Sequence, residues 1–154
     1  MNYSHTQFGY VAPIVLVLLG VWFAVIGSLT DLDSSGLVLF GLVVLLIAVV
    51  VINFNRLTIT IEAESETVEA AFGWGWPRKQ IAIDEITSVD TVKNKWWYGY
   101  GVRKIPHGWM FNVWGQDAVE VRRASGRPFR FGTDEPVELA AAISAAVERQ
   151  TSRG

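Results

Sequence analysis

The sequence predicts a two-helix transmembrane hairpin followed by a mostly-β domain, in which seven strands form a bent antiparallel sheet or barrel capped by a C-terminal helix. Two observations support this prediction. Before Arg56 the only charged residues of the 154-residue chain are Asp31 and Asp33, whereas all 13 lysines and arginines lie from Arg56 onward. After Arg56, apolar and polar residues alternate with a period of two, and the period becomes helical only near the C-terminus. The chain therefore divides into residues 1–55 and residues 56–154.

The first part contains two uncharged segments, residues 9–29 and residues 34–55. A helix of about 20 apolar residues spans the ~30 Å hydrocarbon core of a bilayer, so each segment is long enough to cross it alone. Asp31 and Asp33 separate the segments and must remain at the surface, because a carboxylate at mid-bilayer costs roughly 2.5–3.5 kcal/mol. So short a loop predicts an antiparallel hairpin.

A cleaved signal peptide and a buried hairpin of a soluble protein are the two alternatives. The leader MNYSHTQFGY lacks the lysine or arginine of a signal peptide, and a second apolar segment follows at once. Neither segment has the polar face that a helix at the surface of a soluble core needs. A membrane hairpin is therefore the better interpretation.

The distribution of positive charge predicts the orientation in the membrane. The loop between the two apolar segments has no lysine or arginine, whereas Arg56, Arg78 and Lys79 follow the second segment. Loops on the cytoplasmic side carry the excess of these residues. We therefore expect a multi-pass protein of the cell membrane, with the acidic loop outside and with both termini and the domain at residues 56–154 in the cytoplasm.

Seven strands and one helix are expected after Arg56. In the last strand Phe129 and Phe131 point inward and Arg130 outward, and in the helix Leu139 and Ile143 share one face. The predicted strands span residues 57–61, 67–72, 78–83, 86–92 (with a bulge near Ser88), 109–114, 118–123 and 127–131, and the predicted helix spans about 134–150, with Thr133 or Asp134 as its N-cap.

The stretch YGYGVR…GWMFNVWGQDAVEVRRASGRPFRFGTDEPVELAAAI resembles the bacterial pleckstrin-homology-like (PH-like) domains that follow a two-helix membrane anchor. The glycine after the fifth strand, the AVEV strand and the GRPFRFGTDEP hairpin before the last helix carry the likeness, which covers roughly residues 56–147. The resemblance implies a binding or scaffolding domain at a membrane, and it brings no catalytic residue with it.

One departure from the lipid-binding members concerns the loop between the first two predicted strands. Such domains place basic residues there, whereas this chain has Glu62, Glu64 and Glu66. A polyphosphate headgroup would be repelled by these carboxylates. Specific phosphoinositide binding is therefore not expected.

Residues 94–115 (NKWWYGYGVRKIPHGWMFNVWG) are rich in aromatic side chains, and three interpretations remain open for them. The aromatics pack the sheet, they dock a loop at the membrane interface, or they form a ligand or peptide site. Trp96 and Trp97 are adjacent, so in an extended segment one should enter the domain and the other should not. The candidates for contact with the membrane or a partner are Lys93, Lys95, Trp96, Trp97, Tyr98, Arg103 and Lys104.

The residues that catalysis or metal binding needs are scarce. The chain has no cysteine and only two histidines, His5 and His107, so no metal, cofactor or catalytic site is predicted. The basic excess of residues 78–130 suits the anionic inner leaflet of a membrane, and nucleic acid is not an expected partner. We therefore expect a non-enzymatic binding or scaffolding protein integral to the lipid bilayer. The alternative is an accessory or regulatory subunit of a larger membrane transporter or enzyme, bound through the hairpin, and a second copy of the chain is a further candidate partner.

Overall fold

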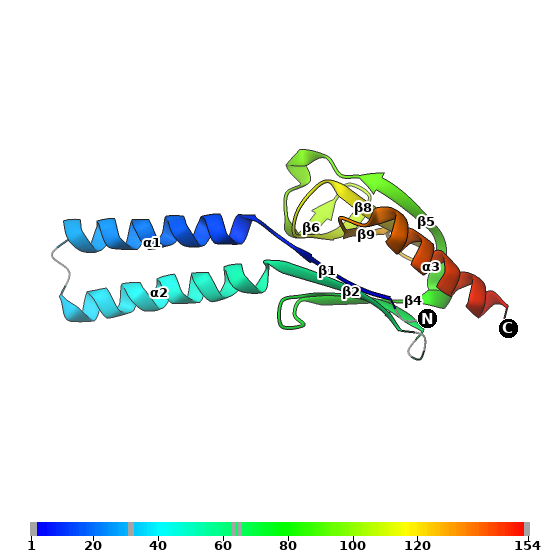
Figure 1. The fold of residues 1–154 in the computed structure, drawn as a ribbon, viewed down its shortest axis with the longest axis horizontal. Helices are drawn as coiled ribbons and strands as arrows, with labels where there is room; N and C mark the ends of the chain where they lie inside the picture. The colour runs from blue at the N-terminus through cyan, green and yellow to red at the C-terminus, as the bar shows by residue number, and fades with distance from the viewer. Residues whose placement is uncertain (1–2, 31–32, 63, 65, 153–154) are drawn as a thin grey trace.

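The computed structural model describes residues 3–30, 33–62, 64 and 66–152. Two long helices come near the N-terminus, a mostly-β region with two sheets follows, and a helix ends the chain (Figure 1). The helical hairpin extends away from the β part, and both ends of the chain lie at the opposite end of the molecule (Figure 1). Asp31, expected in the loop between the helices, is outside the described residues.

Helices α1 (Val11–Leu29) and α2 (Ser34–Asn53) confirm the two predicted apolar helices, although α1 begins and α2 ends two residues inside the predicted segments. They run antiparallel (Figure 1). Asp33 caps α2 by accepting a hydrogen bond from the Gly36 amide at 2.9 Å, which satisfies one of the free donors of the first turn. Phe23 stacks on Phe40 with ring centroids 5.2 Å apart and joins the two helices.

Both helices are long and apolar enough to cross a membrane, by the criteria of length and composition. Most of their large apolar side chains are exposed instead of packing against the rest of the chain. A helical hairpin buried in a soluble core does not fit this exposure, because such helices hide their apolar faces.

The first sheet has the order β1–β2–β3–β4 and is antiparallel throughout. Its strands are β1 (Tyr3–Phe8), β2 (Arg56–Glu62), β3 (Thr67–Phe72) and β4 (Arg78–Ala82). β1 was not predicted, because Ser4, His5, Thr6 and Gln7 give no apolar alternation. It forms because the antiparallel helices bring Phe8 opposite Arg56, and pairing continues from there to Tyr3 and Ile61. The β part therefore includes residues from both sides of the helical hairpin.

The second sheet has the order β5–β8–β9–β7–β6. Its strands are β5 (Ile86–Lys93), β6 (Gly101–Ile105), β7 (Gly108–Asn112), β8 (Asp117–Arg123) and β9 (Phe129–Gly132). The expected irregularity near Ser88 is confirmed by a register shift between Ile86 and Ser88. The end of the predicted third strand is instead a short 3₁₀ helix, η1 (Ile83–Glu85), in which Ile83 is still buried.

The expectation of seven strands in one antiparallel sheet is wrong, since the described residues form nine strands in two sheets. β6 was missed because the sequence GVRKI has a glycine and two adjacent cations, but it pairs with β7 across the turn at Pro106 and His107. β9 lies between β8 and β7 and is parallel to β7, with Phe111 opposite Phe131. A short connection from β7 to β8 therefore does not make these two strands neighbours.

The core lies between the two sheets and helix α3 (Pro136–Thr151). Phe72 of the first sheet meets Phe111 of the second with ring centroids 5.1 Å apart, and Phe131 is fully buried beside Phe129 as predicted. Leu139 and Ile143 of α3 are fully buried against this cluster, which also confirms the predicted helix face. The expected N-cap is wrong by one or two positions: Glu135 occupies it, and the Thr133 hydroxyl accepts a hydrogen bond from the Glu135 amide at 3.1 Å.

Candidate membrane-facing surface

The helices leave the β part through two adjacent connections, β1 to α1 and α2 to β2 (Figure 1). The Gly9 amide donates a 2.7 Å hydrogen bond to the Asn55 carbonyl, so the two connections are bonded to each other. The antiparallel helices thus continue directly into the antiparallel pair β1–β2. This continuity fixes which end of the β part faces the helices.

The turn GWGWP between β3 and β4, residues 73–77, is bonded to the last residue of α2. The side chain of Asn53, which is buried, donates to the Trp76 carbonyl at 2.7 Å and accepts from the Trp74 amide at 3.1 Å. Gly73 has a positive φ and lies directly against Asn53, where a Cβ would clash. The turn is therefore held at the end of the helix.

Trp74 and Trp76 project from this turn with 64% and 74% of their surface exposed. They lie at the level where α2 ends, because the turn that carries them is bonded to Asn53. The sequence feature that indicates their exposure is the presence of two tryptophans in a short glycine-rich turn, where large side chains are difficult to bury. Their position depends on Asn53, which is distant in sequence.

The segment between β5 and β6 lies at the same end of the β part, where its yellow-green ribbon is nearest to the helices (Figure 1). Trp96 and Trp97 belong to a 3₁₀ turn, η2 (Trp96–Tyr98), and are 76% and 59% exposed. Lys95 lies over the Trp97 ring with its ammonium 5.1 Å from the centroid. The expectation that one tryptophan points inward is wrong, because a tight turn does not alternate its side chains as a strand does.

A buried ion pair fixes the start of this segment. Glu120 of β8 accepts from Arg130 of β9 at 2.7 Å and from Arg122 at 3.2 Å, and Arg130 also donates to the Asn94 side chain at 3.1 Å. Arg130 was expected to point to solvent, but most of its side chain is covered. Burial by itself would raise the pKa of Glu120, but hydrogen bonds and charges from Arg130 and Arg122 lower it below the ordinary value.

A third aromatic group joins β6 and β7 to the start of α1. Trp114 stacks on Tyr100 with centroids 5.4 Å apart and meets the edge of Tyr10, the residue before α1, at 5.6 Å. Of the seven aromatic residues in 94–115, only Phe111 is buried. Core packing therefore accounts for one of the seven aromatic side chains of this stretch.

Exposed cations of these segments include Arg56 at the start of β2, Lys95 beside η2, and Arg103 and Lys104 of β6. The Nε of Arg56 donates to the Gly73 carbonyl at 3.0 Å, and the Nε of Arg103 donates to the Tyr100 carbonyl at 2.9 Å. Lys93 is partly neutralised by Asp117 at 3.8 Å. We call the exposed aromatics and cations of this end, together with the half-buried Tyr98, the helix-side surface, which consists of Tyr10, Arg56, Trp74, Trp76, Lys95, Trp96, Trp97, Tyr98, Tyr100, Arg103, Lys104 and Trp114.

The helix-side surface brings together all the predicted contact residues except Lys93, which sits at the end of β5. Glu62 ends β2 and Glu66 precedes β3, so both lie at the opposite end of the first sheet from Arg56 and the turn at residues 73–77.

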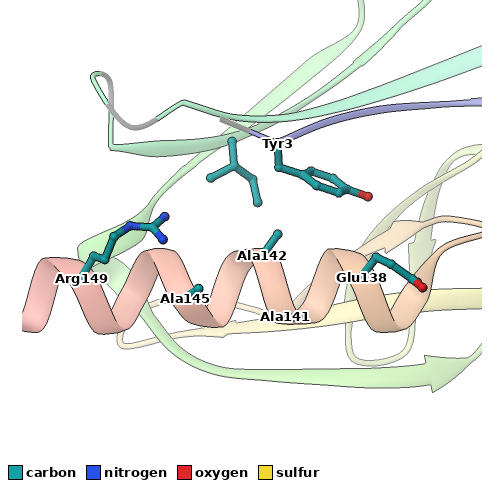
Figure 2. A pocket seen from close by; sticks show the side chains of 7 residues that line it. Tyr3, Glu138, Ala141, Ala142, Ala145 and Arg149 are labelled. Atoms are coloured by element: carbon teal, nitrogen blue, oxygen red, sulfur yellow. The ribbon is translucent and has the colours of Figure 1, made fainter. Parts of the chain in front are cut away.

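A hollow of about 330 Å³ also lies remote from the helices, between α3 and the strands β1 and β2 (Figure 2). Alanines of α3 line it together with Tyr3, Glu138 and Arg149. Burial, followed by the charges of Glu135, Glu138 and Asp134, raises the pKa of Tyr3 to about 12. The hollow contains no residue of 94–115, so it is not the ligand site considered for that stretch.

Comparison with known proteins adds no assignment. No protein-family model matches the chain, and no curated protein matches it. Among the described residues, no three histidine or carboxylate side chains group as metal ligands would.

Proposed function

We propose that the chain is a non-enzymatic, membrane-anchored binding or scaffolding protein whose β part rests on the bilayer surface. In this proposal α1 and α2 cross the membrane and the helix-side surface lies among the lipid headgroups. The observation that carries the proposal is the coincidence of two features: helices with exposed apolar sides, and exposed tryptophans gathered where those helices end.

The dimensions support this placement. α1 has 19 residues and α2 has 20, so their lengths are roughly 28 and 30 Å at 1.5 Å per residue. The hydrocarbon core is ~30 Å thick. Tyr10 and Asn53 would then lie near one boundary of the core, at the depth where tryptophan and tyrosine are enriched in membrane proteins.

The orientation follows from charge. The helix-side surface carries Arg56, Lys95, Arg103 and Lys104, which favour the anionic cytoplasmic leaflet by about 1 kcal/mol each. Both termini belong to the β part, so they would share the cytoplasm with it. The proposed location is the cell membrane, with the acidic loop between the helices outside.

The β part is the proposed binding module. Its strands followed by a C-terminal helix agree with the resemblance to bacterial PH-like domains, and we propose that class for it. The acidic residues Glu62 and Glu66 lie at the end away from the membrane in this arrangement, which argues against phosphoinositide recognition there. We propose neither a nucleic-acid partner nor a cofactor for the protein.

A second candidate function, an accessory subunit of a larger membrane protein, is favoured by one feature of α1. A Cβ added to Gly20 or to Gly27 would have no described atom within 4 Å apart from the neighbouring backbone of its own helix. These glycines therefore do not serve the packing of α1 on α2. Small residues on a lipid-facing side allow close approach of another helix. The candidate partners are another membrane protein or a second copy of the chain.

Labelling of single cysteines tests the anchoring and the orientation. The chain has no cysteine of its own, so Ser35→Cys and Ser152→Cys each provide one thiol. In intact cells an impermeant maleimide should label position 35 and should reach position 152 only after lysis. Recovery of the protein in the soluble fraction would contradict the anchoring, and labelling of position 152 in intact cells would contradict the orientation.

A further inference from the structure

A groove of about 390 Å³ lies where the helical hairpin meets the second sheet. Val11 and Val15 of α1 and Val51 of α2 line it from the helices. Residues 100–103 line it from the β part, together with Val113. Its volume falls within the ~300–1,000 Å³ of small-molecule sites.

If the proposed function holds, the groove lies at the boundary between the lipid headgroups and the acyl chains, where α1 begins and α2 ends. Val11 and Val15 are four residues apart, so the apolar lining extends about 6 Å along α1 from its first residue. The lining is continuous with the exposed apolar sides of both helices. A lipid molecule of the bilayer could therefore enter the groove without crossing a polar surface.

Two polar groups lie in the same groove. Arg103 makes one hydrogen bond through Nε, to Tyr100, and no carboxylate among the described residues pairs with its guanidinium. The side-chain oxygen of Asn55 is covered by the chain itself, so a ligand in the groove does not reach it. The groove therefore combines an apolar wall with a cation that has no carboxylate partner among the described residues.

We propose that this groove binds one anionic phospholipid of the surrounding leaflet. Part of an acyl chain lies against Val11, Val15 and Val51, and the phosphate lies at Arg103, whose planar guanidinium suits phosphate oxygens. Continuity with the lipid-exposed helices and the charge of Arg103 favour a lipid over a segment of another protein.

Native mass spectrometry of the full chain in mild detergent measures the binding, with phosphatidylglycerol and phosphatidylcholine as the two probes. We expect one phosphatidylglycerol molecule to be retained in preference to phosphatidylcholine. Arg103→Gln should weaken this binding roughly tenfold, the effect of losing a charge-assisted hydrogen bond. Arg127→Gln makes the same substitution at an exposed residue outside both the groove and the helix-side surface, and should change the affinity by less than about twofold.

A second pair of variants tests the apolar wall independently. Val15→Phe should fill the groove and reduce retention of phosphatidylglycerol, whereas Val17→Phe, on an exposed part of α1 outside the groove, should not. Equal binding by Arg103→Gln and Arg127→Gln, or by Val15→Phe and Val17→Phe, would overturn the proposal. So would a disulfide-linked dimer formed by Val51→Cys, because a second copy would then cover the groove. Failure of the chain to fractionate with membranes would instead contradict the proposed function.

Discussion

The side chain of Asn53 donates a 2.7 Å hydrogen bond to the carbonyl of Trp76 and thereby fixes a turn of the first sheet to the last residue of α2. The same side chain accepts from the Trp74 amide. One buried asparagine thus aligns two exposed tryptophans with the end of a helix that is long enough to cross a membrane. If α2 is embedded, the depth of both tryptophans is determined by this contact.

Replacing Asn53 should release the turn. Asn53→Ala removes the hydrogen bonds to the Trp76 carbonyl and from the Trp74 amide, at a cost of about 0.5–1.5 kcal/mol for each bond lost. Hydrogen exchange of the amides in residues 73–77 should accelerate strongly. Gln80→Ala, on an exposed position of β4, is the control and should leave that exchange unchanged; equal exchange in both variants would contradict the role of Asn53.

The core prediction concerns Phe131, which is fully buried between the sheets. Phe131→Ala should lower the free energy of unfolding by roughly 3–5 kcal/mol, because a well-packed aromatic site is emptied. Arg127→Ala changes an exposed residue four positions earlier and should cost less than about 0.5 kcal/mol. Thermal unfolding of the purified protein measures both, and similar melting temperatures would refute the observed register of β9.

Stability should depend on pH through Glu120. Its pKa is lowered in the folded protein, so its contribution to stability is complete above the pKa of the unfolded chain and is lost as the pH falls through the folded pKa. Unfolding of the wild type at a series of pH values below 5 should show this loss. Glu120→Gln should be less stable at neutral pH and should have a flatter profile; parallel profiles would exclude Glu120 as the source.

The two tryptophans of η2 should contribute little to folding. Trp96→Ser and Trp97→Ser should each change the free energy of unfolding by less than about 0.5 kcal/mol, since both side chains are exposed. Their effect should appear instead in the fluorescence of the membrane-bound protein, where brominated lipid should quench the wild type more than either variant. A large loss of stability in one variant alone would restore the expectation that one ring is buried.

The sequence was sufficient for the elements with strong local patterns. Uninterrupted apolar runs predicted α1 and α2, and period-two alternation predicted the strands that carry the core, including Phe129 and Phe131 on the inner side of β9. β1 and β6 lack such alternation and form only because antiparallel neighbours are placed beside them. The order of the strands could likewise not be predicted from local patterns, because β9 lies between β7 and β8 and pairs with both.

The predicted part of the helix-side surface was the segment with adjacent tryptophans and lysines. The turn at residues 73–77 could not be assigned to the same surface, because its position depends on a contact with Asn53 from another element. Arg130 was misassigned for a similar reason. An arginine on an outward-facing position is expected to meet solvent, but here Glu120 and Asn94 cover it.

Depth measurement of a nitroxide label tests most directly whether the helix-side surface lies at the bilayer. Single cysteines replace Trp76 on that surface and Ser152 at the remote end of the molecule, and each carries the label in the full chain reconstituted in lipid nanodiscs. We predict that the label at position 76 is relaxed more by dissolved oxygen, which concentrates in the membrane, than by a water-soluble nickel complex, and that the label at position 152 shows the reverse. Equal access of the nickel complex to both positions would contradict the account.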